Sequence, residues 1–442
     1  MDSDKRNLTI ASKQETLINT YSIDETHSME SERMKKIKWY SLIDKVYSLP
    51  NLLESWCEVK VNKGAGGVDK ESIEEFERNL KQNLKELHRL LKEKRYAPSP
   101  VRQVLIPKPS SGDLRPLGIP TVRDRVVQQA IKRIIEPIFE AKFKDVSYGY
   151  RPNRGAHEAI QKCKEYIDSE YKWVVDADIA SFFDTVNHKL MMKALNEEIA
   201  DGTLLDLIER FLKAGVMKNG RLEATHEGVP QGGVISPLLA NIYLHYFDGV
   251  MAERGYRLVR YCDDFVIFTR FGRKAERALQ VSKQILEDVL MLKLSPQKTR
   301  IAHAHYDGFE FLGCLFKSGY IRPKDRSIDS YKDRVRRITR RQQPKKLGMI
   351  IERLNPVIRG WGNYFRYGNV KTLYQRLDEW TRMRLRSFLE KKRAVTHQNK
   401  RISNWQLKSQ GLVLLQELLL IPSPAMGQLK RKAVYWKTVR TV

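Results

Sequence analysis

The residues best suited to chemistry are aspartates that lie at the ends of predicted strands. Asp263 and Asp264 stand between two apolar runs, at residues 258–259 and 265–268, and this pattern predicts a β-hairpin with the acidic pair at its tip. A second apolar strand, at residues 173–179, also carries acidic side chains near its end. If the two strands are neighbours, these carboxylates come together at one end of a sheet.

Carboxylates gathered at strand ends repel one another unless a cation neutralises them. Mg²⁺ prefers such oxygen ligands and keeps room for substrate phosphates, and two ions about 3.5–4 Å apart would support in-line displacement at phosphorus. The alternative is a structural acidic turn, because Asp favours turns through hydrogen bonds to its own backbone. The residue pattern alone leaves both interpretations open.

The elements around these aspartates predict a mixed α/β or α+β body. From residue 99 to residue 316, helical segments alternate with short β-rich runs, which are VRQVLIP, WVVDADI, RLVRYCDDFVIFTR and GFEFLGCLF. Before them, the pattern is helical from about residue 39 to residue 95, and apolar residues recur at three- and four-residue steps over residues 71–91. Residues 1–30 are polar and aperiodic, so we expect a flexible tail there.

The overall charge predicts a nucleic-acid partner. Lys and Arg number 80 against 53 Asp and Glu, which gives a formal net charge of +27, and such an excess favours a polyanion. The basic residues do not gather on one amphipathic helix, and no run reaches the roughly 18 apolar residues of a membrane span. The first residues lack the apolar core of a secretory signal, and four cysteines without a CxxC pair support neither a disulfide framework nor a zinc site. We therefore expect a soluble intracellular protein with no membrane partner.

YCDD at residues 261–264 resembles the Y-x-D-D box of reverse transcriptases, and seven further stretches, in the family's order, resemble the group II intron reverse transcriptases, also called maturases. These stretches are IPKPSSGDLRPLGIPTVRDRVVQQAI (106–131), SYGYRPNRGAHEAI (147–160), DADIASFFDTVNH (176–188), GVPQGGVISPLLANIYL (228–244), LSPQKTRI (294–301), GFEFLGCLF (308–316) and LNPVIRGWGNYFRYGN (354–369). Cys262 departs from the alanine that the family often has at this position. Because Cys is also small and apolar, we expect activity to survive the change.

The resemblance implies a right-hand polymerase of the α+β class. Its fingers and palm would be an antiparallel sheet with helices, followed by an α-helical thumb and a small basic C-terminal segment. The expected divisions are a flexible tail (1–30), a helical N-terminal extension with the start of the fingers (31–98), fingers and palm (99–316), the thumb or maturase domain X (317–393) and a basic segment that could bind DNA (394–442). The DNA endonuclease of many relatives would be absent, because no cysteine follows Cys314 and the only histidine after residue 305 is His397.

The resemblance also implies roles for the acidic residues. Asp178, Asp263 and Asp264 would hold two Mg²⁺ ions, one activating the primer 3′-hydroxyl and the other stabilising the leaving pyrophosphate. Asp178 is preferred to Asp176 and Asp184 because it heads the D-x-x-x-F-F spacing of the family. Asp176 stays open as an alternative ligand.

Five further residues match the family's site for the incoming deoxynucleotide triphosphate. Lys108 and Arg115, on a predicted fingers hairpin, would share the charge of the triphosphate, and two solvated surface charges are the alternative. Phe183 would lie beneath the sugar and exclude a 2′-hydroxyl. Gln231 would line the nucleotide pocket, and Lys298 resembles a further nucleotide-site lysine of the family.

In the thumb block we expect Trp361, Tyr364 and Phe365 to belong to the helical core and not to stack on bases. A basic face would contact RNA through its backbone and shape. The residues of this face are Arg334, Arg336, Arg337, Arg340 and Arg341. Because a run of arginines is also typical of a solvated surface, none of them is given a base-specific role.

The function that the resemblance implies is that of an RNA-directed DNA polymerase encoded by a group II intron. It would bind the intron RNA, assist its splicing, and copy an RNA template from a DNA primer into target DNA (retrohoming), in the bacterial cytoplasm or nucleoid. One alternative is an RNA-binding splicing cofactor whose polymerase is dispensable. Another is an intron-free bacterial reverse transcriptase that serves defence or sequence diversification.

Overall fold

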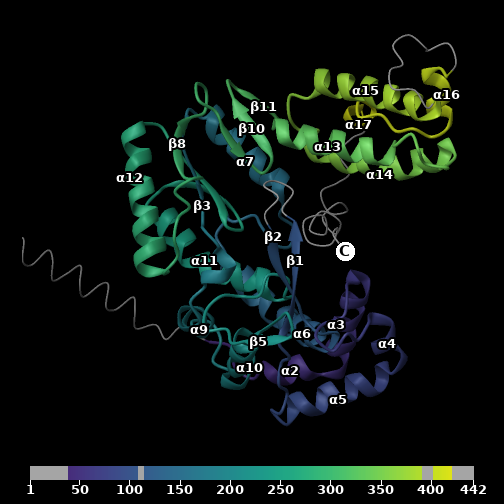
Figure 1. The fold of residues 1–442 in the computed structure, drawn as a ribbon. Coiled ribbons are helices and arrows are strands. Elements are labelled where there is room, and N and C mark those ends of the chain that lie inside the picture. The colour runs from purple at the N-terminus through teal and green to yellow at the C-terminus, as the bar shows by residue number, and fades with distance from the viewer. Residues whose placement is uncertain (1–37, 108–113, 391–401, 421–442) are drawn as a thin grey trace, which may run out of the picture.

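The computed structural model describes residues 38–107, 114–390 and 402–420. In the view of Figure 1, N-terminal helices lie at the bottom, a sheet with flanking helices lies above them to the left, and a group of C-terminal helices lies at the upper right. The tail predicted at residues 1–30 lies outside the described residues. The arrangement is the mixed α+β fold with a helical C-terminal region that the sequence predicts.

The aspartates lie on a four-stranded sheet, which we call the central sheet. Its strand order is β6-β7-β3-β8, and every neighbouring pair is antiparallel. The strands are β6 (Arg257–Tyr261), β7 (Asp264–Thr269), β3 (Trp173–Asp178) and β8 (Arg300–His303). The two acidic strand ends are therefore neighbours, as expected.

Side chains of the central sheet alternate between its two faces, and each face enters a separate hydrophobic core. Val175 belongs to one core, which it shares with the N-terminal helices, α11 (Ser236–Glu253) and α12 (Gly272–Lys283). Val174 belongs to the other core, which it shares with α7 (Ala156–Asp168) and the C-terminal elements. Asp178 and Asp264 are paired in register and share the face of Val174.

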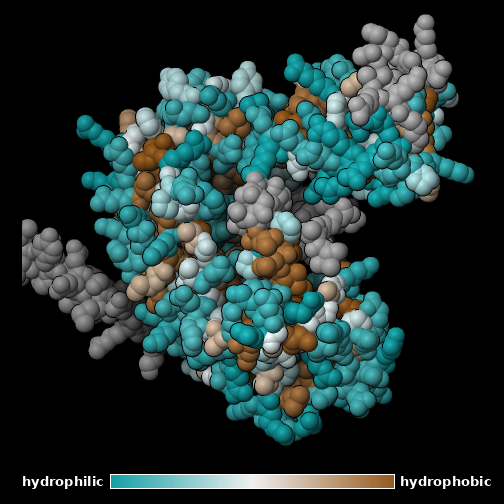
Figure 2. Space-filling model, in the orientation of Figure 1, coloured by the Kyte–Doolittle hydropathy of each residue, from teal (hydrophilic) through white to brown (hydrophobic). Residues whose placement is uncertain are grey.

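A second sheet, in the order β2-β1-β4-β5, lies beside the N-terminal helices. Its strands are β1 (Val101–Pro107), β2 (Leu114–Ile119), β4 (Val216–Lys218) and β5 (Arg221–Glu223). β1 and β2 form an antiparallel hairpin on which Leu105 and Leu114 are exposed, and a hydrophobic patch lies over this hairpin in Figure 2. The residues between the two strands, which include Lys108, lie outside the described part of the chain.

The helical pattern predicted over residues 71–91 is confirmed, and it forms two helices that are divided at Asn79. They are α4 (Ile73–Arg78), which begins with a capping box between Ser72 and Glu75, and α5 (Leu80–Lys92). The side-chain amide of Asn83 donates a hydrogen bond of 2.9 Å to the carbonyl of Phe76. The division is consistent with the chemistry of asparagine, whose side chain competes with the backbone for such bonds and favours helix ends.

The C-terminal helices follow a three-stranded sheet in the order β11-β10-β9. These elements are β9 (Phe309–Phe311), β10 (Cys314–Lys317), β11 (Tyr320–Pro323), α13 (Asp325–Ile338), α14 (Leu347–Phe365), α15 (Lys371–Glu390), α16 (Asn404–Ser409) and α17 (Glu417–Leu420). We call α13–α17 the thumb. Residues 402–420 belong to the segment expected to be a basic appendage, and four of their leucines, Leu407, Leu412, Leu415 and Leu418, are buried in the thumb core.

The remaining helices connect or cover the sheets. They are α2 (Ile43–Tyr47), α3 (Leu49–Asn62), α6 (Val122–Glu140), α7 (Ala156–Asp168), α8 (Phe182–Thr185), α9 (His188–Asn196), α10 (Gly202–Lys213), α11 (Ser236–Glu253), α12 (Gly272–Lys283) and the π-helix η1 (Gln284–Val289). Among the described residues, no helix has the length and the apolar composition needed to cross a membrane.

Candidate active site

Cys262 and Asp263 form a two-residue turn between β6 and β7, because Tyr261 pairs directly with Asp264. Cys262 has a φ of 62°, a left-handed value that short hairpin turns require and that residues other than glycine rarely adopt. The predicted hairpin with an acidic tip is thus confirmed. Its register places Asp264 directly opposite Asp178 on β3, so the tip and the neighbouring strand bring their carboxylates to the same place.

Lys298 contacts this acidic group. Its ammonium lies 2.5 Å from Oδ2 of Asp178. Burial lowers the pKa of Lys298, but the hydrogen bond and charge of Asp178, with the charges of Asp264 and Asp263, outweigh burial and raise that pKa. The structure therefore places Lys298 among the carboxylates, where it balances part of their charge.

Asp176 lies on the same strand and the same face as Asp178, but it has a different partner. Nε of Arg300, on β8, lies 3.4 Å from Oδ2 of Asp176. Burial raises the pKa of Asp176 to about 6, although Arg300 opposes this shift. Asp184, the other neighbour weighed from the sequence, is exposed on α8.

Arg115 and Gln231, two of the residues predicted to bind the nucleotide, are brought together although 116 positions separate them in sequence. Nε of Arg115 donates a hydrogen bond of 2.7 Å to Oε1 of Gln231, and the Gly118 amide donates one of 2.7 Å to the Gln231 carbonyl. The next residue, Gly232, has a φ of +117°, and a Cβ there would lie 2.4 Å from the Gly118 carbonyl oxygen. Only glycine permits this close approach between the loop and β2.

Phe183 is linked to the same loop. Its carbonyl accepts a hydrogen bond of 2.6 Å from the amide of Val229, two residues before Gln231. The ring is buried and meets the ring of Phe182 edge to face, with 5.3 Å between the centroids. Arg115, Gln231 and Phe183 thus lie on elements joined by hydrogen bonds.

Comparison with known proteins identifies the family. The model of the reverse transcriptase (RNA-dependent DNA polymerase) family matches residues 106–316, and the model of the group II intron maturase-specific domain matches residues 328–410. Protein YkfC of Escherichia coli K12 is 40% identical over 257 residues, which are 49% of this chain and 67% of YkfC. The chain belongs to the group II intron reverse transcriptases.

Two further matches cover less of the partner protein or are more distant. The group II intron-encoded protein LtrA of Lactococcus lactis subsp. cremoris is 41% identical over 189 residues, so the matched part spans 42% of this reverse transcriptase and only 31% of LtrA. A solved telomerase structure from Candida albicans aligns with 71% of this chain and 63% of its own, at 14% identity and a TM-score of 0.43, which is too distant to support an argument.

The reverse transcriptase family implies a divalent metal, and the donors at the central sheet fit one in type. Asp178, Asp263 and Asp264 offer carboxylate oxygens only, which suit a hard divalent cation. Within the three described stretches, no three His, Cys, Asp or Glu side chains converge tightly enough to form a complete metal site. The fit therefore rests on the type of donor and on the strand register that opposes Asp178 to Asp264.

The arginines predicted to contact RNA lie at the end of α13 and just after it. Four of the five are exposed and Arg341 is half-buried. Arg336 has a local acidic partner, Asp333, at 2.6 Å, and its guanidinium also lies over the ring of Trp380. In Figure 2 the visible surface of the thumb is mostly hydrophilic.

Trp361 packs against Tyr331, with 4.9 Å between ring centroids, so its predicted place in the thumb core is confirmed.

The sequence did not reveal a buried network beside the Cys262–Asp263 turn. Arg260 directly precedes Tyr261 and is completely buried, as is its ion-pair partner Asp248. A signal was present, because an arginine inside the apolar run of β6 must find a buried acid. The identity of that acid could not be read from the sequence, since Asp248 lies on a separate helix.

Proposed function

We propose that this protein is an RNA-directed DNA polymerase encoded by a group II intron, which binds the intron RNA, assists its splicing and copies it into target DNA. The observation that carries the proposal is the register that opposes Asp178 to Asp264, with Asp263 in the adjoining turn. The match to the maturase-specific domain supports the splicing role and favours an intron-encoded enzyme over one that serves defence. The relative in Escherichia coli supports a bacterial setting, for which we propose the cytoplasm or nucleoid.

The proposed mechanism assigns each residue a task. Asp178, Asp263 and Asp264 would hold two Mg²⁺ ions, which when bound lower the pKa of the primer 3′-hydroxyl and stabilise the pyrophosphate. Arg115 would take part of the triphosphate charge through its guanidinium fork. Gln231, held by Arg115 and by the Gly118 amide, would form the wall of the nucleotide pocket. Lys108 lies outside the described residues, and its role remains a proposal from the sequence.

Two other side chains would refine this reaction. Lys298 would balance the charge of Asp178 before substrate binds and would lie within reach of the incoming nucleotide. Phe183 would exclude the 2′-hydroxyl of a ribonucleotide. The thumb arginines, Arg334, Arg336, Arg337, Arg340 and Arg341, would hold the phosphate backbone of an RNA duplex, which they recognise through charge and shape.

The test is Mg²⁺-dependent extension of a DNA primer annealed to an RNA template. We expect the rate of primer extension to fall about 100-fold or more in Asp178→Asn and in the double variant Asp263→Asn, Asp264→Asn. Each change removes carboxylate charge that would hold the metal ions in the transition state. Asp176→Asn is the matched control on the same strand and face, and we expect it to keep most of the rate.

Two results would contradict parts of this proposal. Full extension by the double variant would remove the polymerase assignment. Equal losses in Asp176→Asn and Asp178→Asn would restore Asp176 as a metal ligand. Splicing of the intron RNA is measured in parallel, and we expect the double variant to retain it, because the thumb arginines are unchanged.

A further inference from the structure

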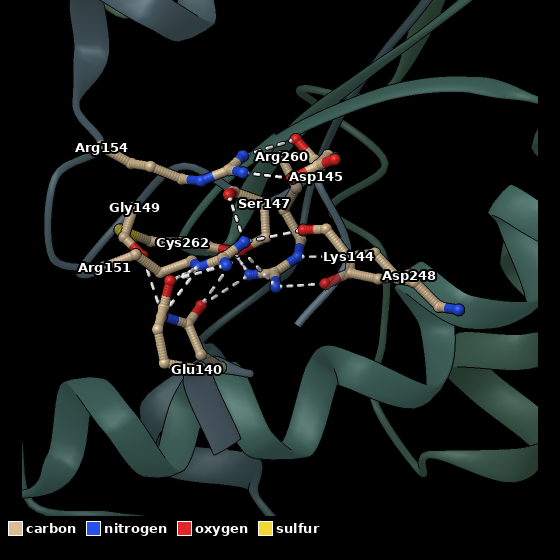
Figure 3. A network of polar contacts seen from close by, with 11 residues as sticks. Glu140, Lys144, Asp145, Ser147, Gly149, Arg151, Arg154, Asp248, Arg260 and Cys262 are labelled. Carbon is tan, nitrogen blue, oxygen red and sulfur yellow. Dashed lines mark hydrogen bonds and ion pairs between the residues drawn. The ribbon is translucent and has the colours of Figure 1, made fainter. Parts of the chain in front are cut away.

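Arg260 is a buried arginine whose hydrogen-bonding capacity is completely used. A guanidinium has five N–H donors, and all five are engaged here. Nε and Nη2 donate to the two carboxylate oxygens of Asp248, Nη1 donates to Oδ1 of Asn241 at 3.1 Å and to the carbonyl of Cys262 at 2.9 Å, and Nη2 also donates to Oγ of Ser147 at 2.8 Å. Figure 3 shows the guanidinium between Asp248 and the turn residue Cys262.

This network joins two consecutive elements, α11 and β6, to a segment that lies 113 positions away in sequence. Asp248 and Asn241 lie on α11, Ser147 lies in the connection before α7, and Arg260 is the penultimate residue of β6, with Tyr261 between it and the turn. The backbone amide of Arg260 also donates to the carbonyl of Val146 at 2.8 Å. A shift of any one segment would therefore leave a buried donor or acceptor without its partner, which is costly.

The contact with Cys262 acts directly on the catalytic turn. The carbonyl that accepts the hydrogen bond from Arg260 belongs to the peptide bond between Cys262 and Asp263. The guanidinium therefore fixes the orientation of this peptide plane, and with it the direction of the backbone at Asp263. This matters because Cys262 has the strained φ of 62°, which persists only where surrounding contacts hold it. Asn241 holds the segment beside the turn, since its side-chain amide donates a hydrogen bond of 2.8 Å to the carbonyl of Gly149, which lies against Cys262.

A role in stability alone does not explain such a pair. Buried ion pairs contribute little net stability compared with apolar side chains of the same volume, because both charges lose their hydration. The pair instead fixes geometry, because a planar guanidinium with five donors holds five acceptors in defined positions at once. Here one of these acceptors is the peptide bond that leads into Asp263.

We propose that Arg260 is a positioning residue, which locks the Cys262–Asp263 turn so that Asp263 and Asp264 present their carboxylates to the same divalent cations as Asp178. The inference rests on the proposed polymerase function, which it deepens. Arg260 itself touches neither substrate nor metal. It acts through the turn, so we expect its loss to weaken metal binding and to change nucleotide binding little.

The test compares Arg260→Lys with a matched control, Arg151→Lys. Arg151 is a second buried arginine of the same region (Figure 3), with 4% of its side chain exposed and bonds to Glu140 and to the carbonyls of Lys144 and Ser147. It makes none of the contacts to Cys262 that distinguish Arg260. Lysine keeps the charge in both variants but loses the fork, so both should lose similar thermal stability.

The readout is Mn²⁺ binding by the full chain, measured from the electron paramagnetic resonance signal of free Mn²⁺, which does not depend on activity. We expect Arg260→Lys to weaken Mn²⁺ binding about 10-fold, the lower range for losing an outer-shell partner, and to raise the Mg²⁺ concentration for half-maximal extension by a similar factor. The KM for deoxynucleotide should change little. Arg151→Lys should bind Mn²⁺ as the wild type does.

The outcomes separate this inference from the proposed function. Wild-type Mn²⁺ affinity in a folded Arg260→Lys variant, or an equal loss in Arg151→Lys, would overturn the positioning role while leaving the polymerase intact. Absence of primer extension by the wild type would instead refute the proposed function. If Arg260→Lys does not fold, Asn241→Ala takes its place, because it keeps the Arg260–Asp248 pair but removes one acceptor of Arg260 and the bond that holds Gly149 against Cys262. Unchanged Mn²⁺ affinity in that variant would also overturn the inference.

Discussion

Phe182 and Phe183 are adjacent aromatic residues. Both are buried in the same hydrophobic core, where Phe182 also packs on Tyr243 with 6.3 Å between ring centroids. Phe183 differs in that its carbonyl accepts a hydrogen bond from Val229, in the loop that leads to Gln231. Two similar buried rings thus offer a direct comparison, because only Phe183 is bonded to the loop of the proposed nucleotide pocket.

We predict that Phe183→Val relaxes the discrimination between deoxynucleotides and ribonucleotides. A smaller side chain would leave space for a 2′-hydroxyl, and we expect ribonucleotide incorporation to rise about 10-fold, the scale of a lost steric contact. The measurement is primer extension with dCTP and CTP in competition. Phe182→Leu is the control, and it should lower the free energy of unfolding by about 1–2 kcal/mol without changing the sugar preference. If both variants changed the sugar preference equally, the role of Phe183 would be refuted.

At the scale of elements, the Cys262–Asp263 turn is supported by the segment that contains Gly149. A Cβ on Gly149 would lie 2.5 Å from both the amide nitrogen and the sulfur of Cys262, which is far inside ordinary contact distance. The carbonyl of Gly149 is held by Asn241, so the segment cannot move away without breaking a buried bond. The turn and its support therefore fit together only if residue 149 has no side chain.

We predict that Gly149→Ala displaces the turn and slows primer extension by up to about 100-fold, the effect of a misplacement near 1 Å. Gly249→Ala is the control. Gly249 lies on α11 next to Asp248, and a Cβ there would meet nothing within 4 Å, so the change should stabilise the protein by about 0.5–1 kcal/mol because glycine is unfavourable in helices. The measurements are the rate of primer extension and the thermal unfolding of both variants. A Gly149→Ala enzyme that extends primers at the wild-type rate would contradict the prediction, because the turn would then tolerate the displacement.

The sequence predicts these elements unequally, for physical reasons. The strands that end in Asp178 and begin with Asp264 are predictable because burial on both faces makes them continuously apolar. The break at Asn79 is less visible, since periodicity continues across it while a local side-chain hydrogen bond ends the helix. The pairing of Arg260 with Asp248 depends on how α11 packs on β6, which no local pattern encodes. The roles proposed for the site residues follow from the family resemblance, because residue type and spacing alone fit a structural acidic turn equally well.

At the scale of the whole molecule, the thumb and the central sheet share one hydrophobic core. Val174 and Val266 of the sheet belong to the same buried cluster as Tyr374 of the thumb. The two parts are also joined by hydrogen bonds, since the imidazole Nε2 of His157, on α7, lies 2.8 Å from the Tyr364 carbonyl. The thumb is therefore part of the fold of the sheet and not a separate module on a linker.

We predict that a chain ending after Pro323 will not give a soluble polymerase. Removing the thumb would expose the apolar residues of the shared core, and large exposed apolar patches lead to aggregation. The measurement is the soluble fraction and the size-exclusion profile after expression. A chain ending after Leu420, which keeps every described element, should remain soluble. A monodisperse shortened chain that extends primers would contradict the shared-core interpretation.

The two-residue connection between Tyr261 and Asp264 also limits how this gene can vary. Because strand side chains alternate, a single inserted codon would turn every later residue of β7 to the opposite face, moving Asp264 away from Asp178 and exchanging the two cores. Substitutions in this turn alter one contact, as the cysteine at position 262 illustrates, whereas a change of length alters the whole strand. The turn at Asn219–Gly220 joins short strands, and its glycine faces open space, so length variation between homologues is expected there and not at the catalytic hairpin.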